Sequence, residues 1–151
     1  MGLKKEMLEL AQLITFSDKI KTSISEVGVD WHIDHSLKVI LSVYNSLKKS
    51  KPENYMWTFN LLRRYIFSHG SIPRRKRKTS KIVVAIDKIH QNNLNAQLLK
   101  AKKVLKEIET LPPESHYEHP YFGLLNLKDS LRFMEIHTQH HLKIIRDIID
   151  E

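Results

Sequence analysis

The chain has 151 residues, a formal net charge of +8, no cysteine, and a hydrophobic content of 41%. Its length fits one domain, taken as residues 1–151, its hydrophobic content argues against disorder, and the missing cysteines exclude disulfides, thiolate metal sites and a cysteine nucleophile. The N-terminus has no signal-peptide core and no apolar run reaches about 18 residues, so we expect a soluble, cytoplasmic protein that does not span a membrane.

Two helices are predicted in the N-terminal third of the chain. The apolar face of the first repeats at helical spacing, at Leu3, Met7, Leu10 and Ile14. Residues 15–29 give no clear pattern, and Gly28 ends this stretch or marks a turn. Asp30 is a plausible N-cap for a second helix that runs to about Ser50. That helix is apolar on two sides, which is typical of a helix buried between neighbours.

A third helix is predicted between Pro52, which suits a first turn, and Gly70, which suits a helix end. Arg63 and Arg64 can face water. The apolar surface of this helix would come from Trp57, Leu61, Tyr65 and Phe67. A basic segment at 73–81 follows as a loop, and "KIVVAI" is read as an extended connection because an isolated strand lacks a partner.

The C-terminal half predicts two more helices. Asn92 or Asn93 can cap the fourth, and Pro112 with Pro113 stops it. A loop is expected over 112–125, after which Asn126 starts the last helix with Asp129 three residues on, in the manner of a capping box. The pattern as a whole predicts an all-α protein, an antiparallel bundle of about four main helices.

Histidines of the last helix form the most distinctive pattern. His137 and His141 are four residues apart, so they point the same way, within an apolar stripe, while His140 falls at its edge. A buried histidine is often structural, bonded to a carbonyl or carboxylate, since a neutral imidazole in a core is costly unless it is paired. Two ring nitrogens one turn apart can also reach one divalent ion at about 2.1 Å.

A third metal ligand would have to come from another helix. The segment "DWHIDHSLKVI" offers His32 and His35, and the helical wheel does not separate them cleanly. Either could instead lie at the surface, or orient a ligand from outside the coordination shell.

The combination of "WHIDHSLKVI", "HPYFGLLN" and "HTQHHLKII" resembles the DinB/YfiT-like superfamily of bacterial proteins. Within it, the chain looks like an uncharacterised branch with a His-Pro-x-Phe-Gly loop and a last helix ending in His-x-x-His-His. The basic "GSIPRRKRKTSK" also looks like a loop of that branch, and the resemblance covers about residues 23–148.

The resemblance implies a four-helix bundle, here with an extra short helix and a basic loop, that binds one divalent metal through three histidines. Carried over, the ligands are His35, His137 and His141, with His32 as the alternative for the first, because the run around that ligand is unusually rich in histidine. Some members of the superfamily are thiol-dependent transferases or isomerases, so a low-molecular-weight thiol is an implied cofactor. Related bundles often form homodimers.

The leading functional hypothesis is a metal-dependent enzyme, a hydrolase or a thiol-dependent transferase, acting on a small molecule that the sequence does not specify. Three neutral histidines leave coordination positions open, and zinc or nickel suits such ligands. His140 and His119 are candidates for outer-shell or proton-transfer roles. The simpler interpretation assigns His119 to the packing of its loop.

The alternative hypothesis is a binding protein without catalysis. The basic run could hold nucleic acid or another anionic partner through Arg74, Arg75, Lys76, Arg77 and Lys78. A solvated basic loop explains the run as well, and it contains no aromatic residue for stacking on bases. A third hypothesis keeps the metal in a purely structural role, with no exchangeable water position.

Overall fold

The structure is a computed structural model that describes residues 3–74 and 88–150. These residues are predominantly helical, as predicted, with one small antiparallel sheet. The α-helices are α1 (Lys4–Leu13), α2 (Val29–Lys49), α3 (Leu61–His69), α4 (Gln91–Ile108) and α5 (Leu127–Ile149). The strands are β1 (His116–His119) and β2 (Gly123–Asn126), and short 3₁₀ turns lie at Ile14–Phe16 and Pro52–Asn54. Among the described helices, none combines the length and the apolar character needed to cross a membrane.

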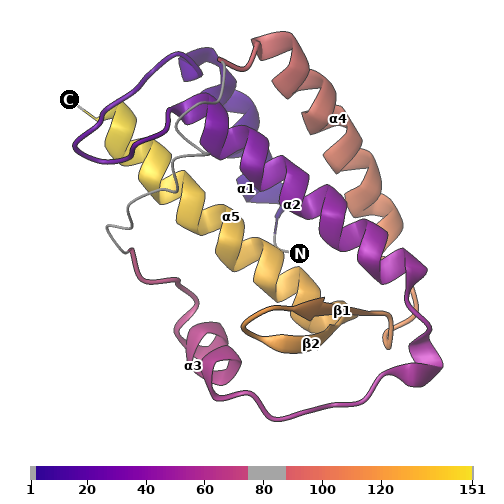
Figure 1. The fold of residues 1–151 in the computed structure, drawn as a ribbon. Helices are drawn as coiled ribbons and strands as arrows, with labels where there is room; N and C mark the ends of the chain where they lie inside the picture. The colour runs from indigo at the N-terminus through magenta and orange to yellow at the C-terminus, as the bar shows by residue number, and fades with distance from the viewer. Residues whose placement is uncertain (1–2, 75–87, 151) are drawn as a thin grey trace.

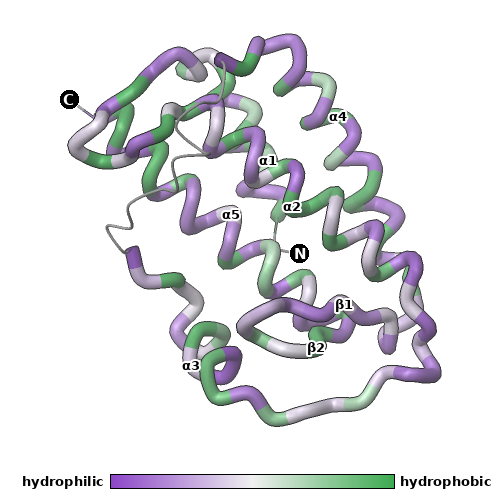
Figure 2. The backbone as a smooth tube through the Cα atoms, viewed as in Figure 1, coloured by the Kyte–Doolittle hydropathy of each residue, from purple (hydrophilic) through white to green (hydrophobic). Residues whose placement is uncertain are grey.

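Four helices pack around a shared apolar core (Figure 1). Helix α2 contacts α4 and α5, and α1 contacts the same two helices. Hydropathy alternates along these helices (Figure 2), as expected when each turns one side to the core and another to water. The side chains with the least exposure come from all four and from β2, among them Leu10, Ile33, Leu37, Leu94, Leu125 and Ile145.

Helices α2 and α4 run in the same direction, which differs from the expected antiparallel arrangement (Figure 1). Side-chain hydrogen bonds join Asp34 to Gln97 near their starts and Tyr44 to Glu107 near their ends. The reason is the long connection between them, which returns the chain to the start of α2. There the Asp30 carboxylate accepts a hydrogen bond from the backbone N–H of Ile89 at 2.9 Å. Helices α2 and α5 are antiparallel, as predicted (Figure 1).

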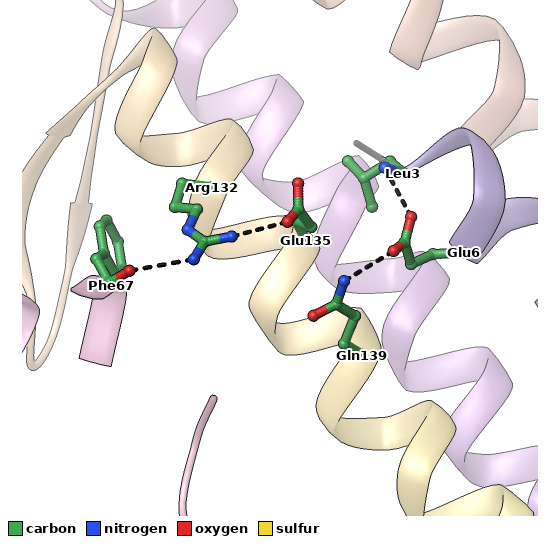
Figure 3. A network of polar contacts seen from close by, with 6 residues as sticks. All are labelled: Leu3, Glu6, Phe67, Arg132, Glu135 and Gln139. Carbon is green, nitrogen blue, oxygen red and sulfur yellow. Dashed lines mark hydrogen bonds and ion pairs between the residues drawn. The ribbon is translucent and has the colours of Figure 1, made fainter. Parts of the chain in front are cut away.

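Polar contacts attach α1 and α3 to α5 (Figure 3). The buried Glu6 carboxylate accepts hydrogen bonds from the backbone N–H of Leu3 at 2.8 Å and from Gln139 at 2.9 Å. The guanidinium of Arg132 donates to the carbonyl of Phe67, at the end of α3, at 3.1 Å. These contacts fix the ends of the shorter helices on the long C-terminal one.

The predicted third helix is wrong in its first half. After the turn at Pro52–Asn54 the chain is irregular, and α3 begins only at Leu61, where the Asn60 side chain accepts from the backbone N–H of Arg63 at 2.8 Å. The end is as predicted: Gly70 follows the helix in the left-handed conformation, at φ 73°.

The predicted burial of this segment is wrong for Trp57, Leu61, Tyr65 and Arg63, whereas Arg64 is exposed and Phe67 is half-buried, as predicted. Trp57, Leu61 and Tyr65 are exposed, whereas Arg63 is 7% exposed. The Arg63 guanidinium donates to the carbonyls of Thr58, Phe122 and Leu124. It therefore joins α3 and the preceding segment to the hairpin, and the fixed fork of donors suits several carbonyls at once.

Residues 112–125, expected to form a loop, contain the β1–β2 hairpin. Its register pairs His116 with Asn126 and His119 with Gly123. Gly123 has φ 73°, a conformation that favours glycine, and the turn carries no Asn-Gly or Asp-Gly signal that would predict a hairpin. The Asn126 side chain accepts from the backbone N–H of Asp129 at 2.9 Å, so the predicted start of the last helix is confirmed.

Candidate metal centre

Three of the predicted ligands meet between α2 and α5. His35 comes from α2 and His137 and His141 come from α5, and each offers one ligand atom within 4.8 Å of the other two. The ring centroids lie 5.1 Å (His35 to His137), 4.8 Å (His35 to His141) and 4.6 Å (His137 to His141) apart. Bonds of about 2.1 Å to one ion place two ligand atoms at most about 4.2 Å apart, so the rings are close enough to hold a metal after a small adjustment.

Burial keeps these imidazoles neutral. Desolvation, helped by the neighbouring histidines, lowers the pKa of His137 to about 3 and lowers that of His141 further. Desolvation also lowers the pKa of His35, although the nearby Asp34 carboxylate acts in the opposite direction. A neutral imidazole has one nitrogen lone pair free, which is the form that binds a metal.

Within the part of the chain that the structure describes, a fully buried nitrogen of the cluster lacks a hydrogen-bond partner. Nδ1 of His137 is buried and, within the described part of the chain, accepts or donates no hydrogen bond. A buried polar atom without a partner is costly, and it calls for an explanation such as a bound ion or water. This atom is the local sign that the cluster is suited to an additional ligand.

His32 lies outside the three-histidine cluster but contacts it directly. Its Nδ1 lies 2.9 Å from Nδ1 of His141, and its Nε2 lies 2.9 Å from the hydroxyl of Ser25. Burial lowers the pKa of His32 to about 4, so this ring is neutral as well. Of the two candidates for the third ligand, the structure therefore groups His35 with His137 and His141 and places His32 behind His141.

The hydrogen bond to His32 decides which nitrogen of His141 is free. Because Nδ1 of His141 faces His32, Nε2 is the atom left to bind an ion. His141 would then carry its proton on Nδ1 and donate it to His32, whose Nε2–H would donate to Ser25. Such outer partners commonly fix the tautomer and the orientation of a metal-binding histidine.

Trp31 covers the cluster from the α2 side. Its ring stacks on His35 at 4.6 Å with an interplanar angle of 10°, and it lies 6.1 Å from the ring of His141. The indole limits the movement of His35 and adds an apolar wall. Trp31 itself is half-buried.

His140 lies beside the cluster without joining it. Its ring is 5.3 Å from that of His141. Burial lowers the pKa of His140, and a hydrogen bond with the backbone of Ile72 opposes that shift. His140 thus connects α5 to the segment that follows α3.

His119 packs the hairpin, as the simpler interpretation held. Its Nδ1 accepts from the backbone N–H of Tyr121 at 3.0 Å and of Phe122 at 3.2 Å, and its ring stacks on Phe122 at 4.4 Å. Phe133 contacts both the His119 ring, at 4.7 Å, and the His137 ring, at 5.5 Å. The hairpin therefore supports the cluster through an aromatic side chain.

The predicted anion-binding run is described only at its first residue. Arg75, Lys76, Arg77 and Lys78 lie outside the described residues. Arg74 forms an ion pair with Asp147 of α5, so its charge already has an acidic partner.

Comparison of the chain with family models, with curated proteins and with solved structures gives no match. The fold and the site define a predominantly helical protein with a three-histidine cluster that could hold a metal ion. The His-x3-His spacing in the sequence indicated His137 and His141, while His35 was implied by the resemblance, with His32 as its alternative. Sequence reasoning missed the role of Ser25, which no spacing rule indicates because it lies outside any helix.

Proposed function

We propose that this protein is a metal-dependent enzyme of the DinB/YfiT-like type, a four-helix bundle that holds one divalent ion through His35, His137 and His141. The observation that carries the proposal is the meeting of three neutral imidazoles from two helices, with ligand atoms within 4.8 Å of one another. The quoted resemblance supports the same three residues, and zinc or nickel suits them.

The ligand set favours a catalytic site over a structural one. Three protein ligands are typical of catalytic zinc sites, which keep an open position, whereas structural sites close the shell with four. No carboxylate belongs to this group, so the ion would keep its full charge. When bound, it would lower the pKa of a water molecule or activate a thiolate, which corresponds to hydrolase or thiol-dependent transferase chemistry.

The surrounding residues would position the ligands. His32 orients His141 through the Nδ1 contact, and Trp31 stacks on His35. Phe133 contacts His137 from the hairpin side. These contacts restrict ring rotation, and a prearranged set of ligands needs less ordering when the ion binds.

Metal binding by His137 is the first prediction. We expect purified, tag-free protein to bind about one equivalent of zinc or nickel, and His137→Ala to bind it at least about 100-fold more weakly. Loss of a direct ligand should cost more than the roughly 10–100-fold that follows loss of an outer partner. The measurements are elemental analysis and calorimetric titration of the apoprotein.

The matched control is His90→Ala. His90 is the N-cap residue of α4. Its side chain is exposed and makes no capping hydrogen bond, so removing it should leave the metal affinity unchanged. Equal metal affinity in His137→Ala and the parent would refute the ligand assignment. Water-proton relaxation by the cobalt-substituted protein then separates the two roles, because a structural site would show no exchanging water.

A further inference from the structure

A hollow of about 600 Å³ lies between α2 and α4, next to the histidine cluster. We call it the α2–α4 groove. Its α2 wall consists of Trp31, Asp34, His35 and Lys38. These residues follow the spacing i, i+3, i+4, i+7 and so share one helix face. Asn93, Gln97 and Lys100 line the opposite wall with the same periodicity on α4.

The groove is rich in positive charge. Lys38 and Lys100 project from the two walls, Lys88 lies in the segment just before α4, and the acidic lining residue is Asp34. The Asp34 carboxylate is already paired, with Lys38 at 2.7 Å and with the amide of Gln97. Within residues 3–74 and 88–150, neither Lys88 nor Lys100 forms an ion pair. Like charges in a concave surface concentrate the potential that attracts anions.

His35 belongs to both features. It lines the groove and it is one of the three clustered histidines. Trp31, stacked on the His35 ring, forms the adjoining part of the same wall. A molecule in the groove therefore lies against the α2 side of the cluster, with cationic groups around it and amide side chains across from it.

We infer that the α2–α4 groove binds the substrate of the proposed metal site through an anionic group, a carboxylate or a phosphate. This inference rests on the proposed function for its link to catalysis. Lys88 and Lys100, which have no acidic partner among the described residues, complement such an oxyanion, and the amides of Asn93 and Gln97 provide neutral polar contacts beside it.

The test uses cobalt-substituted protein with inorganic phosphate as the probe. We expect the ³¹P relaxation of phosphate to be faster with the cobalt form than with the zinc form, because the groove adjoins the cluster. The double variant Lys88→Ala/Lys100→Ala should bind phosphate about tenfold more weakly, the loss expected when two exposed charge contacts are removed. A parallel titration with succinate distinguishes a preference for carboxylate from one for phosphate.

The control removes the same charge elsewhere on α4, in Lys102→Ala/Lys103→Ala, whose side chains are exposed and do not line the groove. Equal weakening by both double variants would indicate general attraction and overturn the groove. If cobalt binds and gives its visible absorption but does not change the relaxation of phosphate, the groove does not bind the anion beside the cluster. The metal site would still stand. If no metal binds, the proposed function fails, and lysine-dependent phosphate binding by the apoprotein alone decides whether the groove is an anion site.

Discussion

At the scale of single residues, His32 is a side chain that contacts a proposed metal ligand from outside the cluster. It touches His141 and Ser25 but is not one of the three clustered histidines. Its expected role is to accept a hydrogen bond from Nδ1–H of His141, which leaves Nε2 of the His141 ring free to bind the metal. A residue of this kind acts on the ion only through the ligand that it orients.

The second prediction follows from this role. We expect His32→Leu, which removes the acceptor, to weaken zinc binding by about 10–100-fold. His32→Asn should recover most of that affinity, because its side-chain oxygen can accept where Nδ1 of the histidine did. Calorimetry measures the affinity, and ¹⁵N NMR of His141 should show the proton on Nδ1 in the parent and in the asparagine variant.

A purely structural role for His32 predicts a different pattern. Both variants would then lower the free energy of unfolding without changing the tautomer of His141. Equal zinc affinity in the parent and in His32→Leu would refute the positioning role.

At the scale of elements, α3 is attached through the buried Ile66 and through the polar contacts of Arg63. Its outer face carries Leu61, at 71% exposure, while Arg63 is buried against three carbonyls. The sequence places Arg63 and Arg64 side by side, and nothing local distinguishes the buried one. Only the position of the hairpin, formed about 60 residues later, makes that distinction.

The third prediction concerns this contact. We expect Arg63→Met to lower the free energy of unfolding by about 2–3 kcal/mol, because it leaves carbonyls that are bonded to a charged group without a donor. The methionine keeps the length and apolar stem of the side chain, so the effect reports on hydrogen bonding. Urea denaturation measures the change, and hydrogen exchange should show faster opening of the hairpin.

Arg64→Met provides the control, since Arg64 is exposed. A surface substitution of this kind normally changes stability by less than about 0.5 kcal/mol. If the two variants lose the same amount, the guanidinium of Arg63 does not hold the hairpin in the way described.

At the scale of the whole molecule, some locally encoded features were predictable, although the predicted caps at Asp30 and at Asn92 or Asn93 are wrong because α2 and α4 begin earlier, after Gly28 and His90. The Asn126 cap and the Gly70 helix end were read from a few neighbouring residues, and both are confirmed. The His137 and His141 pair followed from helical spacing. The parallel packing of α2 and α4 and the α2–α4 groove depend on the long connection between those helices, about which periodicity carries no information.

Histidine burial across the molecule gives the last prediction, on pH. In the folded apoprotein the pKa of His32 is lowered to about 4 and that of His137 to about 3, whereas an unfolded chain has histidines near 6.5. Below about pH 6.5 the unfolded state binds more protons than the folded state, so the free energy of unfolding decreases as the pH is lowered. This decrease continues until the pH reaches the folded-state pKa values. Each of these two residues should contribute about 1.4 kcal/mol per pH unit in that window.

Urea denaturation of the apoprotein between pH 5 and 7 measures this slope, and the acid slope should become shallower in His32→Asn/His137→Asn, which lacks both titrating groups. Zinc should still raise stability between pH 5 and 7, because burial keeps the pKa values of these histidines below that range and their neutral nitrogens in the folded state can bind the ion. An unchanged slope in the double variant would show that His32 and His137 do not control acid unfolding. A shallower slope in the double variant would mean that a proposed metal ligand, His137, and its neighbour His32 also make the apoprotein sensitive to acid.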